Sequence, residues 1–557
     1  MLSTSTAEAS AASVVRALPT LLPRQGAPRW SLALLVALVF LKGLIWGVTI
    51  PYFWAADEDY HFLYVESLTT QQQLPSPDRP LYPREYGEVG KAIDYDAYGQ
   101  GPRRSFDGDP KRSVRDLARL PSSAREPTEV GRGVGVVHPP LYPLVGATVN
   151  ATAGDASVLT RITLVRWVSA LIGALAVYLA WLLAAQVLRR FIHQFTAAFL
   201  VAVQPMFSYM TGVVNHDVAL VACFSAALAL MLFLMRSPPR AGQGLWLGGA
   251  IALALLIKAT AVVLLPLAAL AYLAQVLVHR GCWREAARSA GLAAMVVLVL
   301  AAWWYIRAKL VYGSFTGATT TLSDTSQSSL PAGERGILAT SPGELWSYFR
   351  EWMALTYRTY WWHFMWFEAP STRSLWFYLP MAAGGAGAVG LARVAWLGRR
   401  TLLSAEDPLP RQIVLMVVAT LLIIVPFLGV DLVRRADGLG FMVNGGRYLL
   451  PTYGAVAVLF VVGIRGLVGH RLLTPALVVA AAIATVFNLR VYDFHYLNRY
   501  YGHDSLGEIL RRLSFDRPEF VTPTSIATVA LLAVVAAAGA WGFALKASNA
   551  DLDASGR

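Results

Sequence analysis

Long apolar runs recur through almost the whole chain and constrain its fold more than any other feature. A run of about 20 apolar residues is long enough to cross the roughly 30 Å hydrocarbon core of a bilayer as a helix. The rest of the composition agrees, because 56% of the 557 residues are hydrophobic and only 15% are charged. The sequence therefore predicts an all-α, polytopic membrane protein.

The apolar runs predict about twelve transmembrane helices. We expect them at Ser31–Ile50, Thr163–Leu188, Phe195–Val214, Val218–Met235, Leu245–Ile257, Ala261–Val278, Ser289–Ile306, Leu375–Leu397, Ile413–Val430, Leu449–Ile464, Leu472–Leu489 and Ser525–Leu545. The first run is too long for the apolar part of a signal peptide and lacks a clear cleavage site before Pro51, so it reads as an uncleaved signal anchor.

The net charge of +13 resembles a nucleic-acid signal, but its distribution points to a membrane. Short loops rich in arginine alternate with the apolar runs, which is the pattern of loops that stay in the cytoplasm. These arginines are Arg189, Arg190, Arg236, Arg240, Arg280, Arg284, Arg288, Arg399, Arg400, Arg411, Arg465 and Arg471. We therefore expect a protein of the plasma (inner) membrane with both termini cytoplasmic and no nucleic-acid partner. The two cysteines, Cys223 and Cys282, predict no disulfide.

This topology divides the chain into two short cytoplasmic tails and one transmembrane domain with three extracytoplasmic loops. The tails are 1–29 and 547–557, the domain is 30–546, and the loops are 51–162, 307–374 and 491–524.

The extracytoplasmic loops differ in character. Pro83 to Gly135 is rich in Pro, Gly and charge, and predicts loop or partly disordered chain. Leu345 to Phe367 is crowded with aromatic residues, which suits a helix lying in the headgroup layer. Leu506–Leu513 predicts a short amphipathic helix.

An acidic cluster follows the first apolar run directly. Asp57 is a good N-cap for a helix from Glu58 to about Thr70, and four-residue spacing places Asp57 and His61 on one side of it. Two carboxylates and an imidazole within one turn can serve as a general base or hold a metal ion. The alternative is an ordinary capped surface helix that happens to be acidic.

Other polar residues gather on the same predicted membrane face. They are His138 and Tyr142 in a proline-fixed loop, Asn215, His216 and Asp217 in the next outer turn, Lys258 and Arg307 at the ends of two runs, and Arg447 with Tyr448 after two glycines. Each has a plainer explanation: Asp217 as a helix N-cap, Lys258 as a snorkelling side chain, or Arg307 as an interfacial anchor. Together, acids and cations at one face are what a transferase acting on a lipid phosphate needs, since cations hold the phosphate and a carboxylate accepts a proton.

At these residues the chain resembles the GT-C superfamily of polyprenyl-phosphate-dependent glycosyltransferases. It looks most like bacterial relatives of the protein O-mannosyltransferases and lipid A aminoarabinose transferases, including an uncharacterised family of predicted membrane proteins. The motifs that carry the resemblance are Asp57-Glu58 with His61, His138-Pro139-Pro140-Leu141-Tyr142, Asn215-His216-Asp217, Ile257-Lys258-Ala259-Thr260, Trp304-Tyr305-Ile306-Arg307 with Tyr312-Gly313, and Gly446-Arg447-Tyr448-Leu449-Leu450-Pro451.

The resemblance implies a GT-C-like fold and an inverting glycosyltransferase that takes its sugar from a polyprenyl phosphate. It implies Asp57 as catalytic base, with Asp217 assisting. Glu58 and His61 would position Asp57 or a bound cation, such as Mg²⁺ or Mn²⁺ held by Asp57, Glu58 and Asp217; no cofactor is certain.

We expect the donor phosphate to be bound by Lys258, Arg307 and Arg447. The pocket would be lined by His138, Tyr142, Asn215, His216 and Tyr448. The acceptor would be an extracytoplasmic glycan, lipid or protein of the cell envelope.

Two other functions stay open. A transporter or flippase of cell-envelope precursors would carry ionisable groups near the middle of its spans. Lys42 is the main example here, whereas most charges lie at span ends. A structural or assembly protein would use the aromatic stretch for partners, but would leave the Asp57, Glu58 and His61 cluster unexplained.

Overall fold

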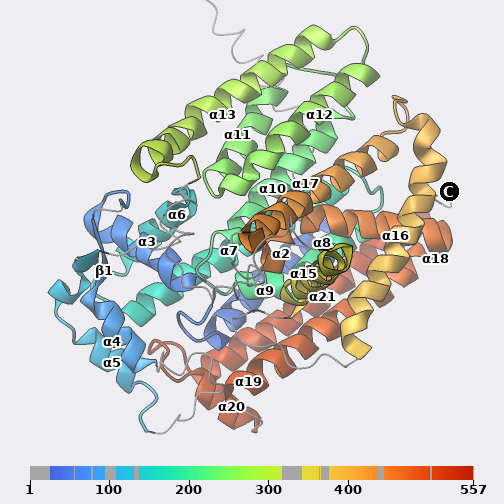
Figure 1. The fold of residues 1–557 in the computed structure, drawn as a ribbon. Helices are drawn as coiled ribbons and strands as arrows, with labels where there is room; N and C mark the ends of the chain where they lie inside the picture. The colour runs from blue at the N-terminus through green and yellow to red at the C-terminus, as the bar shows by residue number, and fades with distance from the viewer. Residues whose placement is uncertain are drawn as a thin grey trace, which may run out of the picture.

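The protein is described here from a computed structural model, which describes residues 26–55, 57–76, 79–93, 108–130, 137–316, 341–362, 364, 375–436, 445–501 and 505–555. It is a helical bundle with the short helices and strands between Pro80 and Val130 grouped at one side (Figure 1). The α-helices are α2 (Ala27–Thr49), α3 (Glu58–Gln71), α4 (Arg84–Ala92), α5 (Arg112–Ala118), α6 (Leu141–Thr152), α7 (Val158–Ala185), α8 (Phe191–Ala202), α9 (Pro205–Met210), α10 (Asp217–Leu234), α11 (Gln243–Leu255), α12 (Leu264–Val278), α13 (Trp283–Tyr312), α15 (Pro342–Trp361), α16 (Leu379–Gly398), α17 (Leu409–Ala436), α18 (Tyr453–Val491), α19 (Asn498–Tyr501), α20 (Leu506–Leu513) and α21 (Pro523–Ser555). Short 3₁₀ segments include η4 (Ala259–Val263) and η9 (Gly445–Thr452).

The structure confirms an all-α polytopic membrane protein. Within the described residues, eight helices are long and apolar enough to cross a bilayer. They are Ala27–Thr49, Val158–Ala185, Asp217–Leu234, Ala259–Val278, Trp283–Tyr312, Leu409–Leu432, Gly445–Val491 and Pro523–Ala550, with shorter apolar helices at Phe191–Ala202 and Gln243–Leu255. The total of twelve spans stays a prediction.

The element α18 consists of two helices that meet at a kink. Its backbone breaks at Gly469, where φ is +73°, a left-handed value that glycine adopts without penalty. The break lies between the spans predicted at Leu449–Ile464 and Leu472–Leu489.

The centre of the bundle is built on α2, α7 and α10. Helix α2 packs on both α7 and α21, while α10 packs on α7 and α11. Gly212, in the turn before α10, lies against α2 so closely that an added Cβ would be 2.7 Å from the Gly47 nitrogen. This contact fixes the turn that carries Asn215 and His216 against the end of α2.

Lys42 lies inside α2, and its contacts are structural. Its ammonium donates hydrogen bonds to the carbonyl of Ala202, the last residue of α8, and to the Ser208 hydroxyl at 2.7 Å. The carbonyls at a helix C-terminus lack partners within the helix, so the partly buried Lys42 amine, by donating to one of them, stabilises the break between α8 and α9.

The first extramembrane segment has more structure than its composition predicts. Strands β1 (Pro80–Pro83) and β2 (Pro127–Val130) pair antiparallel, and α4 and α5 lie between them in sequence. The expectation of loop over Pro83 to Gly135 is therefore wrong for these parts, while 94–107 and 131–135 lie outside the described residues. Buried ion pairs supply the order that the composition did not reveal: Arg161, on α7, bonds to Glu66 and Glu85.

The same segment is tied to the last extramembrane loop by a lysine. Lys111 Nζ lies 2.5 to 3.0 Å from the carbonyl oxygens of Ser514, Arg517, Pro518 and Val521, which share its three N–H donors. The predicted amphipathic helix α20 just before this loop is confirmed at Leu506–Leu513.

Candidate functional site

Asp57 lies in the sharp turn between α2 and α3. The predicted helix is confirmed, since α3 runs from Glu58 to Gln71, but Asp57 does not cap it with its side chain. Its backbone is left-handed, with φ +62°, and its carboxylate accepts a hydrogen bond from the Arg447 guanidinium. The interaction with Arg447, 390 residues away in sequence, replaces the local cap.

Arg447 is held in place by η9 and its contact with α15. The Gly446 nitrogen donates to the Thr359 hydroxyl at 2.8 Å, and a Cβ added to Gly446 would be 2.3 Å from the Tyr360 nitrogen. Only glycine fits this approach, which accounts for the glycine before Arg447. The predicted aromatic helix is helical as far as Trp361, within α15 (Pro342–Trp361), which supports the site from one side; its place in the headgroup layer stays a prediction.

Asp217 links Arg447 to Lys258. Lys258 Nζ lies 2.5 Å from one Asp217 carboxylate oxygen, and Arg447 Nε lies 3.7 Å from the other. Asp217 is the first residue of α10. Its backbone nitrogen donates a hydrogen bond to the side-chain oxygen of Asn215 at 2.8 Å. Four alternating charges therefore form a chain from Asp57 through Arg447 and Asp217 to Lys258, which we call the charge chain.

The members of the charge chain differ in exposure. The Asp57 side chain is 18% exposed, whereas that of Asp217 is 3% exposed and those of Lys258 and Arg447 are 7%. Burial acts to raise the pKa of Asp57, but the Arg447 charge outweighs it and holds that pKa below its usual range. Asp57 is thus the ionised acid that an incoming group can reach.

Tyr448 lies beside both cations. The Lys258 ammonium is 4.4 Å from the centre of its ring and the Arg447 guanidinium is 5.3 Å from it. An aromatic face attracts cations, so Tyr448 helps hold the two side chains together.

Three histidines form a second cluster next to the acids. The ring centre of His216 lies 4.5 Å from that of His61 and 4.4 Å from that of His138. Burial lowers the pKa of His61 to about 4 and that of His138 to about 3, so both rings are neutral at pH 7. Among the described residues, neither ring nitrogen of His216 has a hydrogen-bond partner. The cluster can therefore offer donors and acceptors to a hydroxylated ligand.

Glu58 faces away from this chemistry. Its carboxylate accepts from Arg166 at 2.8 and 2.6 Å and from the backbone nitrogens of Phe53 and Val214. This fully buried pair joins the turn after α2 to α7 and to the turn before α10. Sequence reasoning missed Arg166, although an arginine inside an apolar run is a signal that it has a specific partner.

Two other predicted site residues lie outside the charge chain. Arg307 donates to the Pro75 carbonyl at 2.7 Å and lies over the Trp304 ring, so it ties α13 to the first extramembrane segment. The Tyr142 hydroxyl is bonded to Ser169 at 2.7 Å, which joins α6 to α7.

The three carboxylates predicted as metal ligands each contact a cationic side chain in this structure. Glu58 is bound to Arg166, and Asp57 and Asp217 are bound to Arg447 and Lys258. Within the described parts of the chain, no group of three or more His, Cys, Asp or Glu side chains has the geometry of a metal site.

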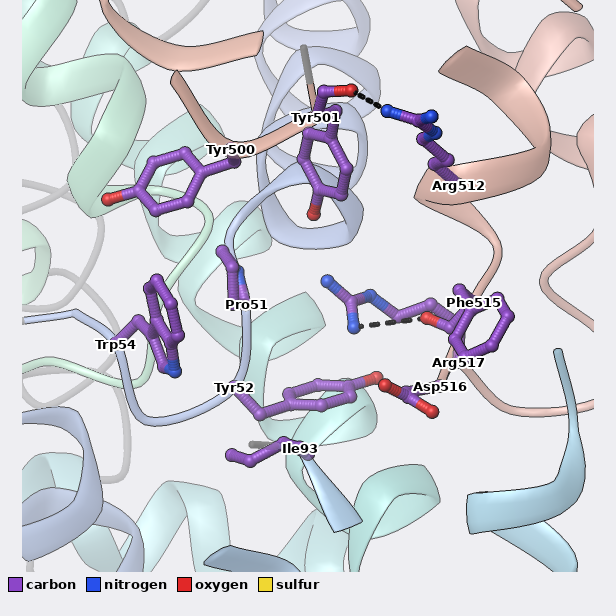
Figure 2. A pocket seen from close by; sticks show the side chains of 10 residues that line it. All are labelled: Pro51, Tyr52, Trp54, Ile93, Tyr500, Tyr501, Arg512, Phe515, Asp516 and Arg517. Atoms are coloured by element: carbon purple, nitrogen blue, oxygen red, sulfur yellow. Dashed lines mark hydrogen bonds between the residues drawn. The ribbon is translucent and has the colours of Figure 1, made fainter. Parts of the chain in front are cut away.

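A small cavity behind the turn belongs to the scaffold. It has a volume of about 30 Å³ and is lined by residues including Tyr52, Trp54 and Arg517 (Figure 2). The Arg517 guanidinium lies 4.5 Å from the centre of the Tyr52 ring and donates to the Val48 carbonyl at 2.9 Å. Such a volume has room for about one or two waters, so it is not a site for a sugar.

Known proteins resemble this chain in fold and in sequence family. No curated protein matches the chain. The structure is similar to a crystal structure of ArnT from Cupriavidus metallidurans bound to undecaprenyl phosphate, with a TM-score of 0.46 and 16% identity over 92% of this chain and 76% of that one.

Similar structures also include the Archaeoglobus fulgidus oligosaccharyltransferase in complex with Zn and sulfate, with a TM-score of 0.43 and 13% identity. The match covers 85% of this chain and 54% of that one. The family model described as "Predicted membrane protein (DUF2142)" matches residues 40–455, most of the chain. The chain belongs to this family of predicted membrane proteins.

Proposed function

We propose that the protein is a membrane glycosyltransferase that moves a sugar from a polyprenyl phosphate to an extracytoplasmic acceptor. The charge chain is the observation that carries the proposal: two buried cations and two acids meet where α10, η4 and η9 begin. A lipid-linked phosphate needs cations near a membrane surface, and the transfer needs a carboxylate beside them.

The cations of the charge chain suit a phosphate. Arg447 presents a planar fork that can donate two parallel hydrogen bonds to phosphate oxygens, while Lys258 adds a point charge beside it. Both are already paired with acids, so a phosphate would exchange places with a carboxylate. Asp57, the more exposed acid, is the one that would give way.

This exchange would also activate Asp57. Arg447 now holds the pKa of Asp57 low, which makes its carboxylate a weak base. Once a phosphate takes over the guanidinium, burial would raise that pKa toward the range in which a carboxylate accepts a proton effectively. Asp217, between Lys258 and Arg447, keeps the two cations in place.

The reaction follows from these roles. Asp57 takes the proton of an acceptor hydroxyl, and the hydroxyl oxygen attacks the anomeric carbon of the sugar. The bond from that carbon to the phosphate oxygen breaks on the opposite face, so the configuration inverts. The negative charge that develops on the polyprenyl phosphate is stabilised by Arg447 and Lys258.

The neutral histidine cluster would bind hydroxyl groups of the donor sugar or the acceptor. His216 has the clearest capacity, because neither of its ring nitrogens makes a hydrogen bond within the described structure, although Nε2 lies 3.5 Å from an Asp217 carboxylate oxygen. The steps described here use side chains of this chain alone, with Asp57 as the base and Arg447 and Lys258 as the cations for the phosphate.

The test is to purify the protein from membranes and identify co-purifying lipids by mass spectrometry. We expect a sugar-bearing polyprenyl phosphate with the wild type and its loss from the double variant Lys258→Ala/Arg447→Ala. Lys309→Ala, an exposed lysine bonded to the Gly313 carbonyl, is the control and should retain the lipid. Equal lipid content in all three would contradict the proposal.

The proposal also places the charge chain outside the cytoplasm. Single cysteines introduced next to Asp57, Asn215 or Arg447 should react with an impermeant thiol reagent in intact cells, and one next to Arg400 should not. Labelling near Arg400 alone would show the opposite orientation in the membrane, and this would contradict an extracytoplasmic site.

A further inference from the structure

A second charged cavity lies at the other end of the bundle. It has a volume of about 860 Å³, within the range of small-molecule sites. It is enclosed by the end of α7, the start of α8, the residues after α10, the loop before α17 and the bend of α18. Its charged and titratable side chains are Arg189, Arg236, Arg465, His470, Glu406 and Asp407.

This cavity is remote from the charge chain. Asp217 is the first residue of α10, whereas Arg236 comes two residues after its last. An α-helix of this length rises about 27 Å. The two sites therefore lie at opposite ends of α10, and a ligand in one does not touch the other.

The acids of the cavity neutralise its arginines only in part, since Asp407 acts favourably on the Arg465 charge from beyond ion-pair distance. Among the described residues, no ion pair joins Arg189, Arg236 or Arg465 to Glu406 or Asp407. Asp407 is engaged elsewhere, since its carboxylate accepts from the Leu409 nitrogen at 3.2 Å, which begins α17, and from the Thr401 hydroxyl.

Two of the arginines also repel each other. Arg465, partly buried on α18, lies close enough to Arg189 for their charges to interact unfavourably. Keeping like charges together at the rim of an open cavity costs free energy unless an anion joins them. Arg236, in contrast, donates to the Gln186 carbonyl at 2.9 Å and is partly satisfied.

We infer that this cavity binds a phosphate-bearing group between Arg189 and Arg465. Guanidinium groups bind phosphate through paired hydrogen bonds, and basic cavities between membrane helices accept the headgroups of anionic lipids. Apolar residues such as Val187 and Leu188 line the same cavity and would contact the glycerol or acyl region of a lipid. The same cations would also bind a soluble phosphate compound. This site does not depend on the proposed transferase activity.

The experiment compares two sources of phosphate. In one arm, the protein is reconstituted in nanodiscs of phosphatidylcholine with or without phosphatidylglycerol, and native mass spectrometry counts the retained anionic lipid. In the other, inorganic phosphate is titrated against the protein in zwitterionic detergent by calorimetry, with chloride as the reference anion.

The decisive variant is Arg189→Gln/Arg465→Gln, and the control is Arg280→Gln/Arg400→Gln. The control removes the same charge from exposed arginines of other loops that do not line the cavity. We expect the cavity variant to lose binding by on the order of tenfold or more in at least one arm, because charge-assisted hydrogen bonds are lost. The control should stay within about twofold.

Thermal unfolding of each variant shows whether it is folded. A second variant, Arg189→Lys/Arg465→Lys, keeps the positive charges. That variant should bind with intermediate affinity, because lysine lacks the planar fork. Loss in the nanodisc arm identifies a lipid, and loss in the calorimetric arm identifies a soluble phosphate. Equal loss in the cavity and control variants, or no loss in either arm, would overturn the inference.

Discussion

Asp57 and Glu58 are neighbours in sequence, and each meets an arginine, but their surroundings differ sharply. Glu58 is completely buried and its carboxylate accepts four hydrogen bonds, two from Arg166 and two from backbone nitrogens. Asp57 is 18% exposed, and within the described structure its carboxylate is bonded to Arg447. The two carboxylates thus divide into one that is fully satisfied and one that still has capacity for a ligand.

This difference shows how to separate structural from chemical acids in a buried polar region. A carboxylate with every lone pair engaged stabilises the fold and cannot accept a proton without losing those contacts. A carboxylate that a ligand can reach, and whose partner arginine is itself suited to phosphate, can change partners during a reaction. The same contrast separates Arg166 from Arg447.

The largest effect should come from breaking the structural pair. Glu58→Gln leaves the Arg166 charge buried without a counter-charge, and we expect unfolding to become easier by about 3–5 kcal/mol. Thermal unfolding in detergent measures this loss. A variant as stable as the wild type would show that the pair does not hold the turn.

Arg447 should affect the donor more than the fold. Arg447→Ala should weaken binding of a short-chain polyprenyl phosphate by about 2–4 kcal/mol, and Arg447→Lys by less, because lysine keeps the charge without the fork. Binding to the three proteins can be measured in detergent. Equal affinities would remove Arg447 from the phosphate site.

The variant Gly446→Ala tests whether the contact with α15 sets the position of Arg447. The Cβ of Gly446→Ala would collide with the Tyr360 backbone, so η9 must shift, at a cost of about 1–3 kcal/mol in stability or donor affinity. Thr359→Val removes the hydroxyl that accepts from Gly446 and should have a smaller effect in the same direction, whereas Thr359→Ser should restore it. Unchanged donor affinity in Gly446→Ala would show that Arg447 does not depend on this contact.

The buried histidines predict a pH dependence of stability. Folding lowers the pKa of His61 to about 4 from its ordinary value, so the unfolded chain binds the proton more readily between these limits. Stability should therefore decrease as the pH falls from about 6.5 to about 4, by about 3 kcal/mol for this group. His61→Asn should flatten the slope in thermal unfolding across that range, and an unchanged slope would assign it to other groups.

The smallest effect is expected at Arg307. Because its guanidinium binds the Pro75 carbonyl, Arg307→Gln should change donor affinity by less than about twofold. A loss as large as that of Arg447→Ala would return Arg307 to the phosphate site, as the sequence had suggested.

The sequence predicted the helices and the residues of the site better than it predicted their partners. Long apolar runs located α2, α7, α10 and α21, and the polar motifs at span ends singled out Asp57, Asp217, Lys258 and Arg447, which the structure brings together. The partners are set by packing between distant segments. Asp57 therefore appeared to be a helix cap, and Glu58 a catalytic acid, because neither Arg447 nor Arg166 is near them in sequence.

The same limit applies to the first extramembrane segment. Its composition predicted loop, since the ion pairs from Arg161 to Glu66 and Glu85 join residues 76 or more positions apart. Arg161 and Arg166 near the start of an apolar run were the available signal for buried acidic partners.

The most direct test of the account is the rate of sugar transfer in Asp57→Asn. Membranes loaded with lipid-linked radiolabelled sugar would be followed for its transfer out of the lipid fraction, with Asp59→Asn, the same change two residues away, as the control. We expect Asp57→Asn to fold and retain the donor while transfer falls by ~10²-fold or more, the scale of a lost general base. We expect Asp59→Asn to stay near the wild-type rate. Transfer at the wild-type rate in Asp57→Asn would contradict the account.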